Sequence, residues 1–339
     1  MDPVTHALSS LAVARVAGKS LPRFGTAMIV AAGLAPDFDY ASYLLGPRAF
    51  LQIHLTLLHS AAGSLLLACV LAAAFCYLDR KRPAKIARAP LKFLSALAAC
   101  CAGIFAHLAL DLCNPDGVQL LWPFKGGWMS SDIAADIDTW IIVILTVGIV
   151  LPYLFRLISE EIGEHKRTPA GQSAAIVVLL LTIVYLGYRA TLHSRAVNLL
   201  LAREYHGRIA LSAGAFPEST SPFDWRGVVV TDNTIEEANV TLRPGREAST
   251  DQSLTHYKPE DSPEVTAGEK AAATVQFLKY ARFPIASVRR MEADYRFEVH
   301  DLRFASDDTG PSNVFVRVDL DSDFRVRDER FLFASSPNP

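Results

Sequence analysis

Residues 93–112 read FLSALAACCAGIFAHLALDL, an apolar run that carries one histidine and one aspartate near its end. A helix of about 20 such residues crosses the hydrocarbon core of a bilayer. Ionisable groups inside a span are expensive unless they are paired or bind an ion, so His107 and Asp111 need partners. Residues four apart lie on one face of a helix, which lets both side chains share one ion or bind each other. The stretch therefore predicts a membrane-spanning helix that ends in a polar site.

Other apolar runs fill the same half of the chain. They are residues 4–18, 24–36, 57–78, 139–155 and 170–188. The first two are shorter than a span and are expected to be tilted or partly re-entrant. We therefore expect an all-α polytopic membrane domain over residues 1–190, with about five to six transmembrane or membrane-embedded helices.

The remaining residues, 191–339, are mixed in polarity and lack long apolar runs. Alternating segments such as DYRFEVHDLRF and NVFVRVDLDSDFRVRDERFLF predict strands, the second of them a hairpin. GEKAAATVQFLKYARF predicts a helix, and GREASTDQSLTHYKPEDSPEV predicts a loop. We expect a smaller, β-rich α+β soluble domain. The net charge of -2 argues against a strongly basic nucleic-acid binder, so no nucleic acid is expected as a partner.

The loop between the first two long runs, residues 79–92, reads DRKRPAKIARAPLK and is strongly basic. Lys and Arg are enriched in cytoplasmic loops, so we expect this loop inside the cell. His59, His107 and Asp111 then lie at the outer ends of their spans. The protein is expected to be a multi-pass protein of the bacterial inner membrane, with its C-terminal domain extracytoplasmic.

Imidazoles and carboxylates recur at the ends of the other apolar segments, in THALSS, PDFD, HLTLLHS and DIDTW. The candidate metal ligands are His6, Asp37, Asp39, His54, His59, His107, Asp111 and Asp138. A mixed nitrogen and oxygen set suits Zn²⁺, with Mn²⁺ and Fe²⁺ as alternatives, and bridging carboxylates allow one to three ions per chain.

Several alternatives stay open at individual positions. Asp37 and Asp39 follow a proline and would also serve as helix caps. His54 is five residues from His59 and does not share a helical face with it. Either Asp136 or Asp138 is the functional acid of DIDTW, and the other is a solvated charge at a helix N-terminus.

These motifs, in their order along the chain, resemble those of the YdjM-like membrane-bound metal-dependent hydrolases. The matching elements are MDPVTH, PDFD, HLTLLHS, HLALDLCNPDGVQLLWPF and DIDTW, within about residues 1–160. That family is in turn similar to the zinc-dependent phospholipase C and single-strand nuclease group, whose members are all-α.

The resemblance implies metal roles for His6, Asp37, His59, His107 and Asp111, with Asp39, His54 and Asp138 as additions. Two positions depart from the family pattern. Leu55 replaces the usual arginine and Leu58 the usual threonine, which puts substrate contacts at this element in question.

The expected function is that of an inner-membrane hydrolase, in which a metal-activated water attacks a phosphoester or lipid-linked substrate at the outer leaflet. Asp39 or Asp138 would serve as the general base if it is not a ligand. The bilayer is the expected partner, and no protein partner is indicated. The alternatives are a metal-ion or proton transporter, and a structural or regulatory membrane protein with a metal-stabilised helix bundle.

Overall fold

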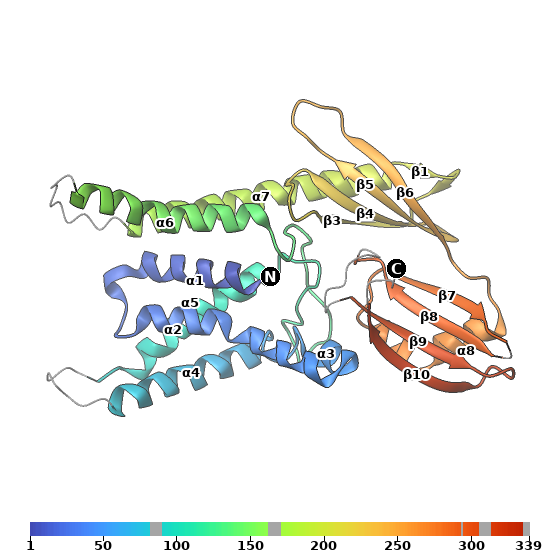
Figure 1. Ribbon diagram of the computed structural model, residues 1–339, viewed down its shortest axis with the longest axis horizontal. Helices are drawn as coiled ribbons and strands as arrows, with labels where there is room; N and C mark the ends of the chain where they lie inside the picture. Colours follow the sequence, from blue (N-terminus) through green and yellow to red (C-terminus); the bar gives the residue numbers. More distant parts are fainter. Residues whose placement is uncertain (82–89, 162–170, 293, 305–312, 335–339) are drawn as a thin grey trace. The chain divides into compact units, whose positions relative to one another are not determined.

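The chain forms two compact units (Figure 1). The computed structural model describes residues 1–81, 90–161, 171–292, 294–304 and 313–334. The first unit comprises Met1–Asp39, Leu55–Thr191 and Ser219–Pro222, and the second comprises Tyr40–His54, Leu192–Glu218 and Phe223–Pro339. A short segment of the N-terminal half, Tyr40–His54, thus packs with the C-terminal half.

The first unit consists of helices. They are α1 (Pro3–Ala17), the 3-10 helix η1 (Gly18–Ser20), α2 (Gly25–Leu34), α4 (Ala61–Lys81), α5 (Phe93–Asp111), α6 (Thr139–Glu161) and most of α7 (Gln172–Leu201). Among the described residues, α4, α5 and α7 are long and apolar enough to cross a membrane, and the apolar part of α6 is shorter. The helical N-terminal half is as predicted. The larger number of five to six embedded helices stays a prediction.

Small residues let helices α1, α2 and α5 approach closely. A Cβ atom added at Gly103 of α5 would lie 2.1 Å from the carbonyl oxygen of Ile29, and one at Gly33 of α2 would lie 1.9 Å from Ser10 Oγ. The core between α2, α4 and α5 is rich in small side chains, mainly alanines with Cys76 and Cys100, beside Met28, Ile29 and Ile104. Close backbone contact through small residues is a usual way for helices to associate in membranes.

Gly103→Val is therefore expected to lower the free energy of unfolding of the first unit by about 3 kcal/mol, the upper end of the usual cost of overpacking. The reason is that the added side chain would clash with backbone atoms, which cannot move aside as a side chain can. Gly187→Val in α7 is the matched control, since a Cβ there meets nothing within 4 Å. Thermal unfolding of both variants in the same detergent measures the difference. Equal unfolding temperatures would contradict the prediction.

The second unit is rich in strands. Its elements are α3 (Pro47–Ile53), β1 (Glu204–Tyr205), β2 (Arg208–Ile209), β3 (Ser212–Pro217), β4 (Asp224–Val230), β5 (Thr234–Thr241), β6 (Ser249–Tyr257), α8 (Pro263–Lys270), α9 (Ala272–Phe277), β7 (Pro284–Arg290), β8 (Tyr295–Asp301), β9 (Val314–Leu320) and β10 (Val326–Phe333). The described strands form a two-stranded sheet β1-β2 and two antiparallel four-stranded sheets, β3-β4-β5-β6 and β10-β9-β8-β7. The predicted β-rich C-terminal region, including the β9–β10 hairpin, is confirmed.

Segment 40–54 belongs to this second unit through its contacts with β10. The rings of Tyr43 and Phe333 stack at a centroid distance of 4.5 Å, and those of Phe50 and Phe333 lie 6.1 Å apart. Arg48 donates a hydrogen bond of 3.1 Å to Gln276. The segment begins in the 3-10 helix η2 (Pro36–Leu45) and ends after α3.

Two expectations for the C-terminal half are wrong. The helix expected over residues 170–188 is longer than its apolar run: α7 continues to Leu201, because Leu192, Ala196 and Leu200 recur every four residues and are buried in the core that contains Trp225. The expected loop around residues 245–265 contains strand β6. Its pairing with β5 includes polar cross-strand contacts rather than apolar alternation, such as Thr255 with Glu236.

Candidate metal centre

The first histidine of the centre is positioned by the cap of α1. Asp2 is the N-cap residue, and its carboxylate accepts hydrogen bonds from the backbone amides of Val4 and Thr5 at 2.9 and 3.0 Å. Pro3 suits the first helical position because its fixed φ matches a helix and it has no amide to satisfy. The MDPVTH sequence thus starts a helix whose first turn contains His6, which is fully buried.

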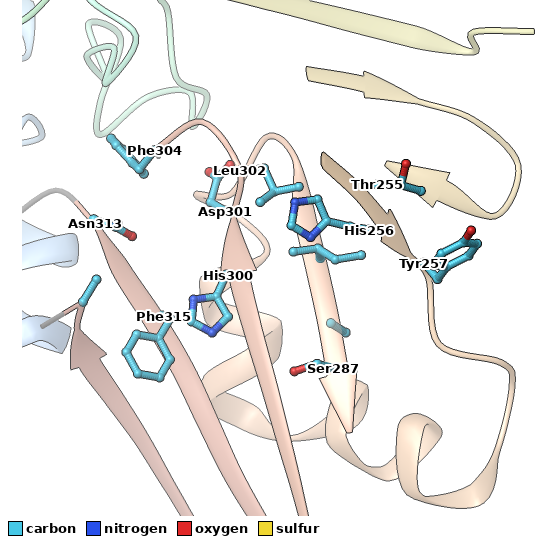
Figure 2. A pocket seen from close by; sticks show the side chains of 13 residues that line it. Thr255, His256, Tyr257, Ser287, His300, Asp301, Leu302, Phe304, Asn313 and Phe315 are labelled. Atoms are coloured by element: carbon cyan, nitrogen blue, oxygen red, sulfur yellow. The ribbon is translucent and has the colours of Figure 1, made fainter. Parts of the chain in front are cut away.

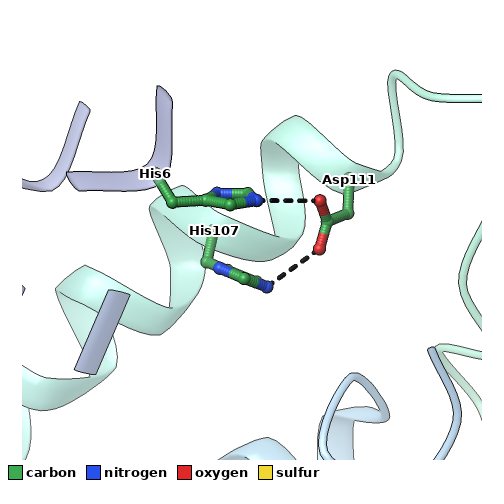
Figure 3. A group of neighbouring side chains, drawn as sticks. All are labelled: His6, His107 and Asp111. Atoms are coloured by element: carbon green, nitrogen blue, oxygen red, sulfur yellow. Dashed lines mark ion pairs between the residues drawn. The ribbon is translucent and has the colours of Figure 1, made fainter. Parts of the chain in front are cut away.

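His107 and Asp111 lie on one face of α5, at its C-terminal end, as their spacing predicts. His107 Nε2 is 2.9 Å from Asp111 Oδ2, and His6 Nε2 is 3.1 Å from Asp111 Oδ1 (Figure 3). The two imidazole rings stack with centroids 3.8 Å apart. Asp111 therefore offers one oxygen to each histidine.

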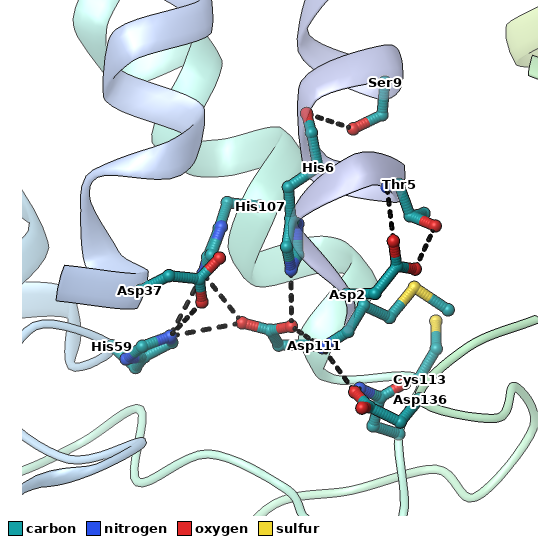
Figure 4. Close-up of polar contacts among 12 residues, drawn as sticks. Asp2, Thr5, His6, Ser9, Asp37, His59, His107, Asp111, Cys113 and Asp136 are labelled. Atoms are coloured by element: carbon teal, nitrogen blue, oxygen red, sulfur yellow. Dashed lines mark hydrogen bonds and ion pairs between the residues drawn. The ribbon is translucent and has the colours of Figure 1, made fainter. Parts of the chain in front are cut away.

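His59 reaches the same place from the turn before α4. Its Nε2 lies 3.0 Å from His107 Nε2 and 3.3 Å from Asp111 Oδ2 (Figure 4). Its Nδ1 lies 3.0 Å from Asp39 Oδ2, and the same oxygen accepts a 3.0 Å hydrogen bond from the backbone amide of Leu55. Asp39 therefore fixes the turn and the orientation of the His59 ring together.

Asp37 completes the group from η2. Its Oδ1 lies 3.7 Å from His107 Nε2 and 3.9 Å from His59 Nε2. The PDFD spacing of two places Asp37 toward the ring nitrogens that face the group and Asp39 behind the His59 ring. We refer to His6, Asp37, His59, His107 and Asp111 as the His/Asp cluster. Two triads within it have metal-ligand spacing, His6–His107–Asp111 and Asp37–His59–His107.

The Nε2 atoms of His59 and His107 face each other and the carboxylates of Asp37 and Asp111, and their protonation follows from the contacts on the other side of each ring. His107 Nδ1 lies 2.8 Å from the carbonyl oxygen of Gly33, which only accepts, so this nitrogen carries the proton. Asp39 fixes the His59 proton on Nδ1 in the same way. In the neutral rings both Nε2 atoms then present lone pairs to each other and to the carboxylates. Such a set needs a cation or additional protons at its centre.

The electrostatics of the surrounding groups agree with that requirement. Burial opposes the charge on His59, but hydrogen bonds to Asp111 and Asp39 outweigh burial and raise the pKa of His59 to about 9. The amino group of Met1 lies 2.7 Å from Asp111 Oδ1. Both observations indicate that the cluster attracts positive charge, which metal ions provide with nitrogen and oxygen ligands of this kind.

Comparison with known families agrees with the membrane assignment. The sequence model of the YdjM inner membrane protein family matches residues 1–196, more than half of the chain. The chain belongs to this family. All five residues of the His/Asp cluster lie within the part of the chain that matches the YdjM family. No curated protein and no solved structure matches the chain.

Three predicted ligands of this YdjM-family chain lie outside both triads: Asp39, which contacts the His59 ring, and also His54 and Asp138. His54 stacks on Phe50 with ring centroids 4.5 Å apart and contacts the ring of Tyr40 at 4.3 Å. Asp138 caps α6 by accepting from the amides of Trp140 and Ile141, each at 3.1 Å. Within the described part of the chain, these contacts give His54 and Asp138 structural roles. Their roles as metal ligands stay predictions.

Asp138→Ala is accordingly expected to leave the metal content unchanged and to lower stability. Loss of an N-cap costs about 0.5–2 kcal/mol, and the hydroxyl of Tyr185, 3.1 Å from Asp138 Oδ1, also loses its acceptor. Metal analysis and thermal unfolding of the same preparation measure both effects. A loss of metal without a loss of stability would restore Asp138 as a ligand.

Two backbone groups of the site were missed from the sequence. The Gly33 carbonyl is available because it lies in the last turn of α2, where carbonyls lack partners within the helix. The Met1 amino group also lies 3.3 Å from Asp136 Oδ1, so Asp136 rather than Asp138 borders the cluster. Of these two groups, only the Gly33 carbonyl could have been suspected from the sequence, because a glycine in a helix permits close contact with a neighbouring helix.

The second unit contains a separate cavity of about 620 Å³ (Figure 2). Its lining includes His256 from β6 and His300 from β8, and His300 stacks on Phe315 with centroids 4.5 Å apart. His256 pairs with Glu237 at 2.7 Å. Neither histidine belongs to the two triads of the His/Asp cluster.

Proposed function

We propose that this protein is a metal-dependent hydrolase of phosphoesters at the outer face of the bacterial inner membrane. The observation that supports it is the convergence of His59 Nε2, His107 Nε2 and the carboxylates of Asp37 and Asp111 on one point. Zn²⁺ is the ion that best suits this mixture of imidazole and carboxylate, with Mn²⁺ and Fe²⁺ as alternatives.

Each residue of the His/Asp cluster has a distinct task in this proposal. His59, His107 and Asp111 would hold the ion, and Asp37 lies at the edge of the same group. His6, which faces the second oxygen of Asp111, would belong to the residues that hold a second ion. A bound ion of this kind lowers the pKa of a coordinated water toward neutrality and polarises the scissile bond.

The general base is assigned to Asp37 rather than to Asp39 or Asp138. Asp39 is engaged by the His59 ring and by the Leu55 amide, and Asp138 caps α6. Asp37 Oδ2 is buried and has no hydrogen-bond partner, so it is the oxygen available to accept a proton beside the ligands. Asp39 and the Gly33 carbonyl act as positioning groups that fix both ring tautomers.

The orientation in the membrane is also part of the proposal. His59 and Asp111 lie at the ends of α4 and α5 opposite to Arg80, Lys81 and Lys92. Positively charged flanks favour the cytoplasm, which supports a multi-pass topology with the His/Asp cluster and the C-terminal domain outside. Residues 82–89 of the basic loop lie outside the described residues.

Metal analysis of the detergent-purified full-length protein tests the proposal. We expect a stoichiometric transition metal, and activity in a phosphodiester screen that a chelator removes and Zn²⁺ restores. His300→Ala, which removes a half-buried histidine outside the His/Asp cluster, is the control that should keep both properties. Absence of metal would refute the proposal. Metal flux into proteoliposomes without hydrolysis would favour the transporter alternative.

A further inference from the structure

Residues 119–129, which read QLLWPFKGGWM, form an ordered loop beside the His/Asp cluster. The amide of Gln119 donates to the carbonyl of Leu55, and the amide of Ala61, the first residue of α4, donates to the carbonyl of Leu120 at 2.8 Å. These two bonds bracket His59 in the sequence. The loop therefore has a fixed place at the end of α4.

Hydrogen bonds within the loop hold its apolar side chains outward. Val118 and Met129 exchange both backbone hydrogen bonds, each of 2.9 Å, and close the loop. The amides of Phe124 and Lys125 both donate to the carbonyl of Leu121, which makes a tight turn at the tip. The Phe124 side chain is 89% exposed, and Leu121 and Trp122 are exposed beside it.

An exposed cluster of this kind requires a partner, because large apolar side chains are rarely left together in water. The lipid bilayer is the partner that adjoins it. Helix α4 begins at Ala61, and its first turns expose Leu65 and Leu66, so the apolar surface of the span continues onto the loop. Trp residues are typical of both membrane–water interfaces, and long Lys side chains near the ends of spans extend their charged group to the interface.

We propose that loop 119–129 inserts into the head-group region of the outer leaflet and fixes the depth of the His/Asp cluster there. Trp122 and Phe124 would lie among the upper acyl chains, and the Lys125 ammonium would lie among lipid phosphates. His59 is two residues from Ala61, which binds the loop, so the cluster lies close to the same level. The choice of the outer leaflet rests on the proposed orientation, whereas the contact of the loop with lipid is independent of the reaction that the His/Asp cluster performs.

Tryptophan quenching by brominated phosphatidylcholine tests the inference, with the full-length protein in nanodiscs. Trp122→Phe should lose a large part of the quenchable emission. Trp225→Phe is the matched control, because Trp225 is buried among the strands of the second unit and should contribute only unquenched emission. Phe124→Asp should withdraw the loop and reduce quenching in the same way, whereas Phe124→Leu should keep it.

Metal content at the wild-type level in each variant would show that the His/Asp cluster is intact. Unchanged quenching in Trp122→Phe, or quenching of Trp122 by iodide in water but not by brominated lipid, would overturn the inference. Trp122 shielded from both quenchers would point to a protein partner and would overturn it as well. Because His107→Ala should leave the quenching unchanged, failure of the proposed hydrolase and failure of the lipid contact are distinguishable.

Discussion

His107→Ala is expected to abolish metal binding and to reduce phosphodiester hydrolysis by more than about 100-fold, since even changes behind a metal ligand cost about 10- to 100-fold. His107 is the residue shared by both triads of the His/Asp cluster, and its Nε2 faces His59 and Asp111, the two other proposed ligands. Its removal leaves each triad with two ligands. Metal stoichiometry and turnover of the purified variant are the measurements.

Asp111→Asn provides a second variant with almost the same shape as the wild type. It removes the charge that lies 2.9 Å from His107 and 3.1 Å from His6, and should also lose the metal. The control for His107→Ala is His300→Ala, which also removes one histidine and should retain the metal. If His107→Ala and Asp111→Asn only lower the unfolding temperature and keep the metal, the His–Asp contacts serve to hold the bundle together.

Asp39→Asn should weaken metal binding by about 10- to 100-fold without abolishing it, the range found for groups that orient a metal-bound histidine. Asp39 contacts His59 on the nitrogen that faces away from His107, and also receives the Leu55 amide. An asparagine keeps an acceptor for one of these donors but loses the charge. Competition with a chelator of known affinity measures the change.

The control for Asp39→Asn is Asp138→Asn, which alters a buried carboxylate that caps α6 and should leave the metal affinity unchanged. Complete loss of metal in Asp39→Asn would make Asp39 a ligand. An affinity equal to that of the wild type would show that the Leu55 turn holds His59 without help from the carboxylate.

Much of the helical half and the cluster could be predicted because each depends on local patterns. The four-residue spacing of His107 and Asp111 is enough to place both on one helical face, and the basic loop is enough to place His59 at the same end. The different positions of Asp37 and Asp39 around the His59 ring could not be predicted, since they depend on the 3-10 geometry of η2.

Tertiary partners decide the parts that were predicted less well. The end of α7 depends on the packing of Leu192 and Leu200 in a core with Trp225. No local sequence pattern predicts this packing. Strand β6 depends on its pairing with β5, where polar pairs such as Thr255 with Glu236 replace the apolar alternation that marks most strands. The orientation of His107 depends on a backbone carbonyl of another helix.

The packing of segment 40–54 on β10 limits where the protein can be truncated. The match to the family ends at residue 196, which would be a natural place to truncate. A protein cut there keeps Tyr43 and Phe50 but loses Phe333, against which both rings pack. This segment joins Asp39 to Leu55, two residues that position His59. Truncation would therefore leave the apolar rings of Tyr43 and Phe50 without their packing partner in the chain between them. The end of the family match is therefore not a folding boundary.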